Sequence, residues 1–321
     1  MSLSSWFAVR RELSPRKRSV LGVGSFLLPL LVWCVVSYVP TVWHPMVLIS
    51  EPGDVEYFQV DMLVNKQVFK DELANMASEH KALPVGEPAN PVYLPAPHQV
   101  AQALYTSFIT PPAQKDGLWL HESLWQSIKV IFWGFLISSL IGLPLGILSG
   151  TYSAISRLFE PFIEFFRYLP APAFGALAVA ILGIYGGPKI AIIVIGTLFQ
   201  QVLIIANTTR KLDYALIEAA MTLGTNKFKL LRHVILPGVL PELYRDQRIL
   251  LGWAWTYLIV AELIGTSSGI TWFITQQARY EHFENVYAAI MMIGFIGLGS
   301  DLILAWLGKH LFPWDKSGNK A

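Results

Sequence analysis

Charge is scarce in this sequence. Of its 321 residues, 54% are hydrophobic and only 14% are Asp, Glu, Lys or Arg, whereas soluble domains carry roughly 25% charged residues. This composition excludes an ordinary soluble domain and predicts an integral membrane protein that contacts the lipid bilayer. The formal net charge of +2 is too small to indicate a nucleic-acid partner.

Cysteine and the common catalytic motifs are also lacking. Cys34 is the single cysteine, so no intrachain disulfide can form. The sequence contains no G-x-x-x-x-G-K-[ST] phosphate-binding loop and no H-E-x-x-H zinc motif, and its histidines are scattered. We therefore predict no catalytic residue, no metal and no cofactor bound by this chain.

Six mostly apolar runs predict membrane-spanning helices, because each is about long enough to cross a bilayer. They cover residues 20–39, 128–150, 159–185, 190–206, 249–264 and 286–308. The first run is too long for the apolar region of a signal peptide, and no small-residue cleavage site follows it. The sequence thus predicts an all-α integral membrane fold whose first helix is not removed.

The distribution of charge predicts the orientation of these helices. Residues 44–122 hold more acidic than basic side chains and no Arg, whereas Lys and Arg gather before the first run, in 208–241 and near the C-terminus. Basic segments stay on the cytoplasmic side, so both termini are predicted there. The predicted parts are a basic N-terminus with the first helix (1–43), a periplasmic insert (44–122), a five-helix core (123–309) and a cytoplasmic tail (310–321).

Local patterns give a coarse structure for the insert. Residues 68–80 are predicted to form a helix, and the Pro-rich segment 84–97 is predicted to be extended or turning. Residues 97–108 carry apolar side chains at helical spacing, which indicates an amphipathic helix on the membrane surface. The insert is either a small cap or a loop packed on the helices.

Glycine and proline mark positions inside the apolar runs. Gly142, Gly146 and Gly150 are four residues apart, which places them on one helical face and allows a second helix to approach closely. Pro144 is expected to kink the same helix. In the third run, Arg167 is spaced to pair with Glu164 on one face.

Five polar residues lie within apolar runs, where buried polar groups tend to face cavities or partner groups. They are Gln200, Gln201, Thr256, Glu262 and Asp301. Each is a candidate for the lining of a translocation path, and interhelical hydrogen bonding is the alternative for each. For Glu262 we favour a structural partner, such as Arg279 or a nearby Ser or Thr.

The stretch 218–241 reads EAAMTLGTNKFKLLRHVILPGVLP and lies between apolar runs. Strong helix formers predict a helix at 214–223, with Asp213 as its cap and Gly224 ending it in a left-handed turn. A second helix is predicted at 226–235, and Pro237 is expected to stop it. We call residues 208–241 the EAA loop.

The extended spacing of this stretch is more specific than the three letters. Gly224 follows Ala220 after three residues, Val234 comes ten after Gly224, and Leu236 and Pro237 close the run. That spacing resembles the EAA signature of permease subunits of bacterial ATP-binding-cassette (ABC) importers. Further stretches resemble the nitrate, sulfonate, taurine and bicarbonate branch of these permeases. They are 94–97, 134–150, 170–172, 188–190, 261–265, 267–269 and 293–301.

The resemblance implies a fold, partners and a cargo. The implied fold is that of type I ABC importer permeases, with six transmembrane helices and here a periplasmic insert between the first two. The implied partners are ABC ATPase subunits that bind ATP and Mg, a second permease copy in a homodimer, and a periplasmic substrate-binding protein or lipoprotein. The implied location is the bacterial inner membrane, and the implied cargo is a small oxyanion: nitrate, an organosulfonate or bicarbonate.

The resemblance also implies roles for residues of the EAA loop. Those expected to dock on the ATPase are Glu218, Ala219, Ala220, Gly224, Leu236 and Pro237. Residues 44–92 depart from the branch, whose members have a much shorter connection there. Two alternatives stay open: the same machinery importing a small organic nutrient, such as a pyrimidine or amine precursor, and a secondary transporter or channel that works without an ATPase.

Overall fold

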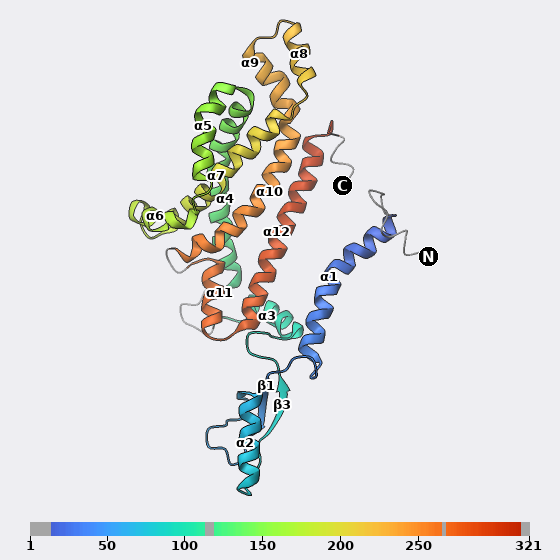
Figure 1. Cartoon of the computed structure of the whole chain (residues 1–321), viewed down its shortest axis with the longest axis vertical. Coiled ribbons are helices and arrows are strands. Elements are labelled where there is room, and N and C mark those ends of the chain that lie inside the picture. The colour runs from blue at the N-terminus through green and yellow to red at the C-terminus, as the bar shows by residue number, and fades with distance from the viewer. Residues whose placement is uncertain (1–13, 113–118, 265–267, 316–321) are drawn as a thin grey trace. The chain divides into compact units, whose positions relative to one another are not determined.

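The computed structural model describes residues 14–112, 119–264 and 268–315 (Figure 1). These residues form two compact units. Unit 1 runs to Thr106 and includes Gln277–Ala288, and unit 2 holds Ser107–Gln276 and the chain from Ala289 onward. Each unit has its own clusters of buried apolar side chains.

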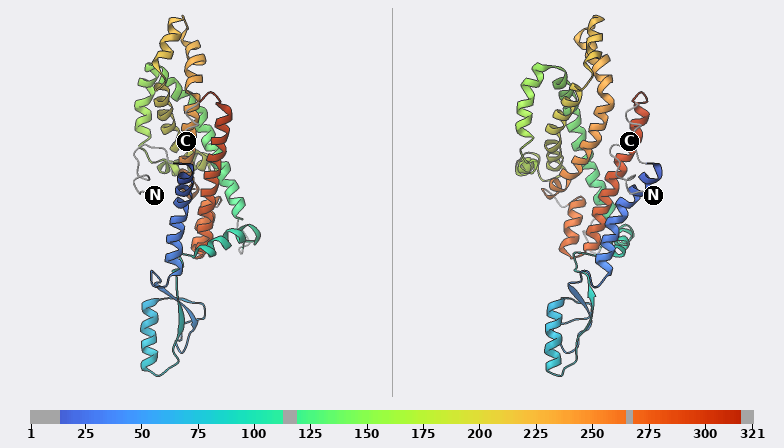
Figure 2. Two further views of the ribbon diagram at one scale, coloured as in Figure 1. Left: turned by 90° about the vertical axis from the view of Figure 1, so that its right-hand side faces the viewer. Right: turned by 45° about the vertical axis from the view of Figure 1, so that its right-hand side comes forward.

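The hydrophilic insert of unit 1 folds as a small antiparallel sheet with one helix beside it (Figure 2). Its strand order is β2-β1-β3, and its core consists of Ile49, Val55, Phe58 and Val64. Pro88 lies in β3, an edge strand, where a missing N–H is tolerated. The elements are β1 (Met46–Glu51), β2 (Leu63–Asn65), α2 (Lys66–Ser78) and β3 (Val85–Ala89).

The helix predicted at 68–80 is confirmed, and it begins slightly earlier because Asn65 caps it. The Asn65 Oδ1 accepts a hydrogen bond from the Gln67 N–H at 2.8 Å. Tyr57 ties the preceding loop to the same helix, since its hydroxyl donates to the Glu72 carboxylate at 2.8 Å, and this hydrogen bond raises the pKa of Tyr57. The prediction of an all-α fold is wrong for the insert, which contains a three-stranded sheet. Its pairing joins segments far apart in the chain, so no local pattern indicates it.

Two further helices belong wholly or largely to unit 1. They are α1 (Pro15–Tyr38) and α3 (Pro97–Ile109), and α3 confirms the helix predicted at 97–108. The C-terminal part of α1 is held by aromatic contacts: the Trp33 Nε1–H donates to the Pro95 carbonyl at 3.1 Å, and the Trp33 ring stacks on Tyr287 with centroids 5.7 Å apart.

Three long helices form the centre of unit 2 (Figure 1). They are α4 (Leu120–Thr151), α7 (Gly186–Arg210) and α10 (Leu236–Leu263). Their shared core includes the fully buried Leu120, Ile192, Ala254 and Leu258. The predicted second and fourth spans lie within α4 and α7, and the fifth, 249–264, lies within α10 except for its last residue. Each helix is longer than the predicted span.

Glycines on one face of α4 set its distance from α7. A Cβ placed on Gly142 would lie 2.9 Å from the Gln201 Oε1, and one on Gly146 would lie 2.7 Å from the Ile205 side chain. A Cβ on Gly150 would likewise lie 2.5 Å from the Thr209 Cβ. Any side chain at these positions would force the two helices apart, and α4 continues through Pro144.

The third predicted span is not one helix. It is divided into α5 (Ser153–Phe166), a short 3₁₀ turn η2 (Ala171–Phe174) and α6 (Gly175–Leu182), with a bend of 85° between the two parts. Pro170 and Pro172 lie at the break, where they cannot supply helical N–H groups. Arg167 lies beyond the end of α5 and donates to the Tyr168 hydroxyl at 2.8 Å, so the predicted pairing with Glu164 is wrong.

The EAA loop contains the predicted helix-turn-helix. The first helix, α8 (Tyr214–Thr222), begins at Asp213, whose carboxylate accepts from the Ala215 N–H at 3.0 Å. The second, α9 (Lys227–Leu230), begins at Asn226, whose side chain accepts from the Lys229 N–H at 2.8 Å. Both helix starts are those expected from a capping side chain.

Pro237 does not stop the second helix, contrary to the prediction. A π-helical turn, η3 (Leu231–Ile235), follows α9 and leads directly into α10. In this wider turn the Leu236 N–H reaches the Leu231 carbonyl, five residues back. Because a π turn breaks the regular i→i−4 pattern just before Pro237, the chain accommodates a residue without an N–H and stays helical.

Two helices complete the chain, α11 (Ile270–Arg279) and α12 (Phe283–Leu311). Within the described residues, four helices are long and apolar enough to cross a membrane, namely α1, α4, α7 and α12, and a fifth span exists if the bent α5–α6 segment counts as one. The multi-pass character of the chain is therefore confirmed. The number six stays a prediction, since it also requires α10 to cross.

Candidate functional site

The helix α8 projects past the end of the unit 2 bundle (Figure 1). Most of its large apolar side chains are exposed. Glu218 and Ala219 are exposed on it, and Ala220 is buried. The exposed large apolar side chains of α8, α9 and the turn between them are Tyr214, Leu216, Met221, Leu223 and Phe228. Leu223 is 85% exposed. Such a patch is typical of a protein-binding surface.

Gly224 forms the corner between α8 and α9. Its φ is +77°, a left-handed conformation that glycine adopts without steric cost. The Gly224 N–H donates to the Met221 carbonyl at 2.9 Å, and the Thr225 N–H donates to the Ala220 carbonyl at 3.2 Å. No atom lies within 4 Å of a Cβ built on Gly224, so the constraint at this corner is backbone conformation and not space.

Leu236 and Pro237 lie on a different element from the other predicted docking residues. They form the first turn of α10, where Leu236 is half-buried and Pro237 is exposed. The helix α8 packs against η3, the turn that precedes them. The six residues predicted to dock thus lie in α8, in the turn that follows it and in the first turn of α10.

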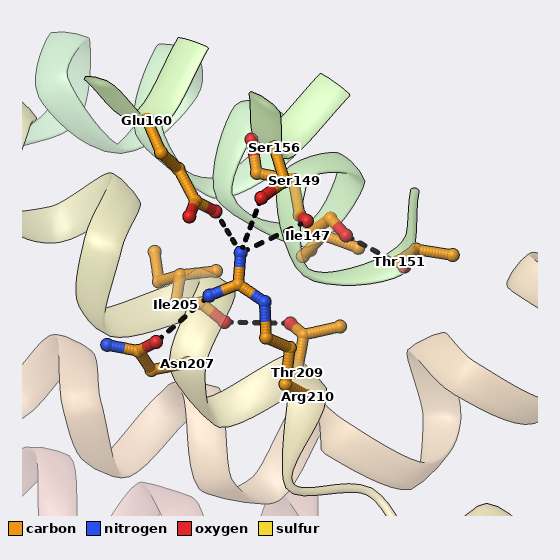
Figure 3. A network of polar contacts seen from close by, with 9 residues as sticks. All are labelled: Ile147, Ser149, Thr151, Ser156, Glu160, Ile205, Asn207, Thr209 and Arg210. Carbon is orange, nitrogen blue, oxygen red and sulfur yellow. Dashed lines mark hydrogen bonds and ion pairs between the residues drawn. The ribbon is translucent and has the colours of Figure 1, made fainter. Parts of the chain in front are cut away.

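Arg210, the last residue of α7, joins the base of the EAA loop to the corner between α4 and α5 (Figure 3). Its guanidinium forms an ion pair with Glu160. It also donates to the Ser156 hydroxyl at 3.0 Å, to the Asn207 side chain at 3.0 Å and to the Ser149 carbonyl at 3.4 Å. The first helix of the loop starts four residues after Arg210, so this contact fixes where α8 leaves the bundle.

A second set of contacts joins the other end of the loop to the bundle. The Thr208 hydroxyl on α7 donates to Asp246 on α10 at 2.6 Å. Arg245 pairs with Asp315 beyond α12 at 2.6 Å and also with Glu242. A Cβ on Gly238 would meet Leu212 at 2.9 Å, so the two ends of the EAA loop are packed against each other.

Gln201 lies at the centre of a polar cluster between α4, α7 and α10. Its side chain is fully buried and accepts from the Ser138 hydroxyl at 2.6 Å. Its amide nitrogen donates to the Ser139 hydroxyl at 2.9 Å and to the Gln247 oxygen at 2.6 Å. This geometry is interhelical hydrogen bonding, the alternative that the sequence left open. Gln200 is only half-buried.

Glu262, at the C-terminal end of α10, is 5% exposed. Its carboxylate accepts from the Ser127 hydroxyl on α4 and from the Thr271 N–H on α11 at 2.8 Å. The Ser127 oxygen in turn accepts from the Ile270 N–H at 2.8 Å. The carboxylate therefore ties the end of α10 to two other helices, and a Ser rather than Arg279 is its side-chain partner. Residues 265–267, part of the family resemblance, lie outside the described residues.

Asp301 and Thr256 have different surroundings. Asp301 on α12 accepts two hydrogen bonds from Arg248 on α10, at 2.9 and 2.8 Å. Thr256 is exposed on α10. Among the five predicted path residues, the structure thus places Gln201 and Glu262 in buried networks, and Asp301 and Thr256 at accessible surfaces.

Sequence reasoning missed Arg210 and Arg248 as individual functional residues. From the sequence, Arg210 is only one of the basic residues of 208–241, and Arg248 only directly precedes the fifth predicted span. Arg248 was expected to precede its span, but α10 begins twelve residues earlier, so Arg248 lies within the helix. The spacing of charges along the chain contains no signal that pairs residue 210 with 160 or residue 248 with 301.

Long apolar helices packed around Gly142, Gly146 and Gly150, with an exposed helix-turn-helix at one end, define a multi-pass membrane protein. Residues 142–314 match the family described as binding-protein-dependent transport system inner membrane component, and the chain belongs to this family. It is a permease subunit of an ABC importer, as the spacing of the EAA loop predicts.

Two relatives and one solved structure illustrate the similarity. The taurine transport system permease protein TauC of Escherichia coli is 31% identical over 226 residues, which cover 70% of this chain and 81% of that one. A putative aliphatic sulfonates transport permease protein of the same organism is 31% identical over 226 residues, covering 69% and 82%. The fold is similar to that of a chain in the MetNI methionine ABC transporter, with a TM-score of 0.53, 19% identity, and coverage of 62% of this chain and 97% of that chain.

Proposed function

We propose that this chain forms the inner-membrane path of an importer for a small oxyanion of the sulfonate, nitrate or bicarbonate class. The similarity to permeases named for taurine and aliphatic sulfonates supports this cargo. In this proposal the chain crosses the membrane six times, with α10 as the fifth span and the bent α5–α6 segment as the third. Both termini lie in the cytoplasm, because basic residues gather near them and in the EAA loop.

The EAA loop couples transport to ATP hydrolysis in a separate subunit. The observation that supports this role most directly is the apolar surface exposed by α8, with Glu218 and Ala219 beside it. An amphipathic helix that projects from a membrane bundle can insert into a groove of a partner. ATP and Mg bind to that partner, and this chain moves cargo without catalytic residues of its own.

The complete importer contains further subunits in this proposal. A second copy of the chain completes the path, two ATPase subunits bind the two EAA loops, and a periplasmic binding protein or lipoprotein delivers the cargo. The insert at 44–92 lies on the delivery side, since its surface carries no Arg and an excess of acidic residues.

The coupling role is tested by Gly224→Val in the complete importer. A β-branched residue is strained at a φ of +77°, so α8 should leave the corner at a different angle. We expect the ATPase to remain partly bound, while ATP hydrolysis no longer depends on cargo and uptake falls. Gly22→Val is the matched control, because no atom lies within 4 Å of a Cβ there and its φ is not positive. Normal uptake by Gly224→Val would contradict the proposal.

Docking is tested separately by Leu223→Asp, which places a charge on the most exposed apolar side chain of the loop. Loss of the ATPase during co-purification of the complex is the expected result, because burying an unpaired carboxylate is costly. Leu83→Asp in the insert, also at an exposed apolar position, should leave the ATPase bound. Equal retention of the ATPase by the two variants would exclude α8 as the docking surface.

A further inference from the structure

A cavity of about 430 Å³ lies between α10 and α12 in unit 2. Its polar groups come from Arg248, Ser300 and Asp301, and the rest of its lining is apolar: Ile249, Leu251, Trp255, Ile293 and three glycines, Gly252, Gly294 and Gly297. No atom lies within 4 Å of a Cβ built on Gly252, Gly294 or Gly297. The cavity therefore has open space beside its charged groups, which a small polyatomic ion can enter.

The charged groups of the cavity lie deep within both helices. Arg248 is twelve residues from the start of α10 and Asp301 is ten residues from the end of α12, which correspond to about 18 and 15 Å along the helix axes. The Arg248 and Asp301 side chains are nevertheless 26% and 45% exposed. Arg248 directly precedes the fifth predicted span (249–264), and Asp301 lies inside the sixth (286–308). A charged side chain within a span faces a water-filled space or the inside of a bundle, not lipid.

The two faces of α12 differ in chemistry. Gly294, Gly297 and Asp301 share the cavity face, at spacings of three and four residues. The bulky, exposed Phe295, Leu302 and Trp306 share the opposite face. A helix with one bulky apolar face and one small, polar face lies between lipid and a polar space, so the cavity side of α12 is the side that meets water.

The ion pair has the geometry of an anion-binding fork. The Arg248 Nε donates to one Asp301 oxygen at 2.9 Å and a terminal guanidinium nitrogen donates to the other at 2.8 Å. Parallel N–H groups of this kind bind any planar pair of oxygens two bonds apart. Sulfonate, nitrate and bicarbonate all present such a pair, so each can replace the Asp301 carboxylate without loss of either hydrogen bond.

We propose that Arg248 is an anion-binding residue of the translocation path and that Asp301 is its built-in competitor. The passing oxyanion displaces the Asp301 carboxylate from the guanidinium, and the carboxylate displaces the anion again on the way out. Rapid transport requires binding that is strong enough to admit the ion and weak enough to release it, and an internal carboxylate supplies the weakening. This inference rests on the proposed oxyanion cargo and names the residue that recognises it.

The test measures the local preference for anions with charged thiol reagents. In the assembled importer, Cys34→Ser removes the only cysteine of this chain, Gly297→Cys places one thiol in the cavity, and labelling is measured on the band of this chain alone. An anionic methanethiosulfonate that carries a sulfonate group and a cationic one that carries a trimethylammonium group are compared by their rates of labelling. We expect the anionic-to-cationic rate ratio to fall at least about fivefold with Arg248→Gln, because even in bulk water a unit charge at 4 Å changes a local concentration by about that factor.

Two further variants separate anion binding from simple folding. Arg248→Lys keeps the charge and should keep the preference, whereas Asp301→Asn frees the guanidinium and should raise the ratio. Leu302→Cys is the control for access. It follows Asp301 in sequence but lies on the opposite face of α12, so it should react with neither charged reagent. The proposal is overturned if Gly297→Cys is unreactive toward both reagents, or if Arg248→Gln leaves the ratio unchanged.

The same variants distinguish this site from the proposed function. Uptake of labelled taurine, nitrate and bicarbonate is measured in proteoliposomes that contain the whole importer. Anion-selective labelling without transport of any of the three would reject the oxyanion cargo and leave the anion site standing. Transport of one of them that is undiminished in Arg248→Gln would reject the site and leave the cargo standing.

Discussion

Gly142, Gly146 and Gly150 of α4 form a glycine seam against α7, and its middle residue, Gly146, allows a quantitative test. In Gly146→Ala the new Cβ would lie 2.7 Å from the Ile205 Cβ and Cγ2 and 2.9 Å from the Val202 carbonyl oxygen. The Ile205 Cγ2 can turn away, but the Ile205 Cβ and the Val202 carbonyl oxygen are fixed by the backbone of α7. Reaching the 3.4 Å of an ordinary contact with the Cβ requires 3.4 − 2.7 = 0.7 Å of separation, which loosens packing between the two helices.

The expected cost follows from that separation. Overpacking of a close-packed interior costs about 1–3 kcal/mol, partly offset by about 1 kcal/mol because Ala is the better helix former. With a shift of about 2–4 °C per kcal/mol for chains of this size class, the melting temperature of the purified complex in detergent should fall by a few degrees, as measured by thermal unfolding.

Gly299→Ala is the matched control for this measurement. It lies inside α12, and no atom lies within 4 Å of its Cβ position, so only the gain in helix propensity applies. Its melting temperature should be unchanged or slightly higher. If Gly146→Ala melts at or above the temperature of Gly299→Ala, the close approach of α4 and α7 is not what stabilises this part of the protein.

Two other contacts give predictions at opposite ends of the bundle. Arg210→Gln should lower stability by about 1–2 kcal/mol, because it leaves the largely buried Glu160 carboxylate unpaired. Glu160→Gln should cost less, because the exposed Arg210 keeps its hydrogen bonds to Ser156 and Asn207. The double variant should lose less than the sum of the two; additive losses in thermal unfolding would show that the pair is not coupled. Glu262→Gln should lower stability by about 1–3 kcal/mol, because the amide has one accepting oxygen where the carboxylate has two, and its NH2 group cannot accept a hydrogen bond from Ser127 or the Thr271 N–H. Uptake per folded molecule should be retained. Normal expression with abolished uptake would instead place Glu262 in the path.

Local signals in the sequence predicted local structure well. Asp213 and Asn226 cap the helices of the EAA loop, and Gly224 has the left-handed conformation that its position requires. These features depend on a few neighbouring residues, so a single sequence contains them. The same holds for α2 and α3, whose residues have clear helical patterns.

Features that depend on partners far along the chain were not predictable in the same way. The role of Arg248 depends on Asp301, fifty-three residues away, and the sheet of the insert depends on strands joined by a helix and loops. Gln201 was identified as buried and polar, but only the structure supplies Ser138 and Gln247 as its partners. Composition indicates that such groups need partners without indicating which ones.

Prolines were the main source of wrong boundaries. Pro170 and Pro172 lie at the break of the third span, whose 85° bend no pattern in the sequence indicates. Pro237 was expected to end a helix, because a proline inside a regular α-helix clashes with the carbonyl four residues back. The wider turn at Leu231–Ile235 removes this conflict, and no pattern in the sequence distinguishes a stop from such a turn.

The extra residue accommodated at Leu231–Ile235 makes the direction of α9 sensitive to chain length. Each residue of an α-helix turns the chain by about 100°, so a deletion of one residue here would swing Phe228 about a quarter turn around the axis of α10 while changing no side chain that contacts a partner. In the proposed complex with an ATPase, such a deletion would abolish the fit through register alone, with every residue of the docking surface still present.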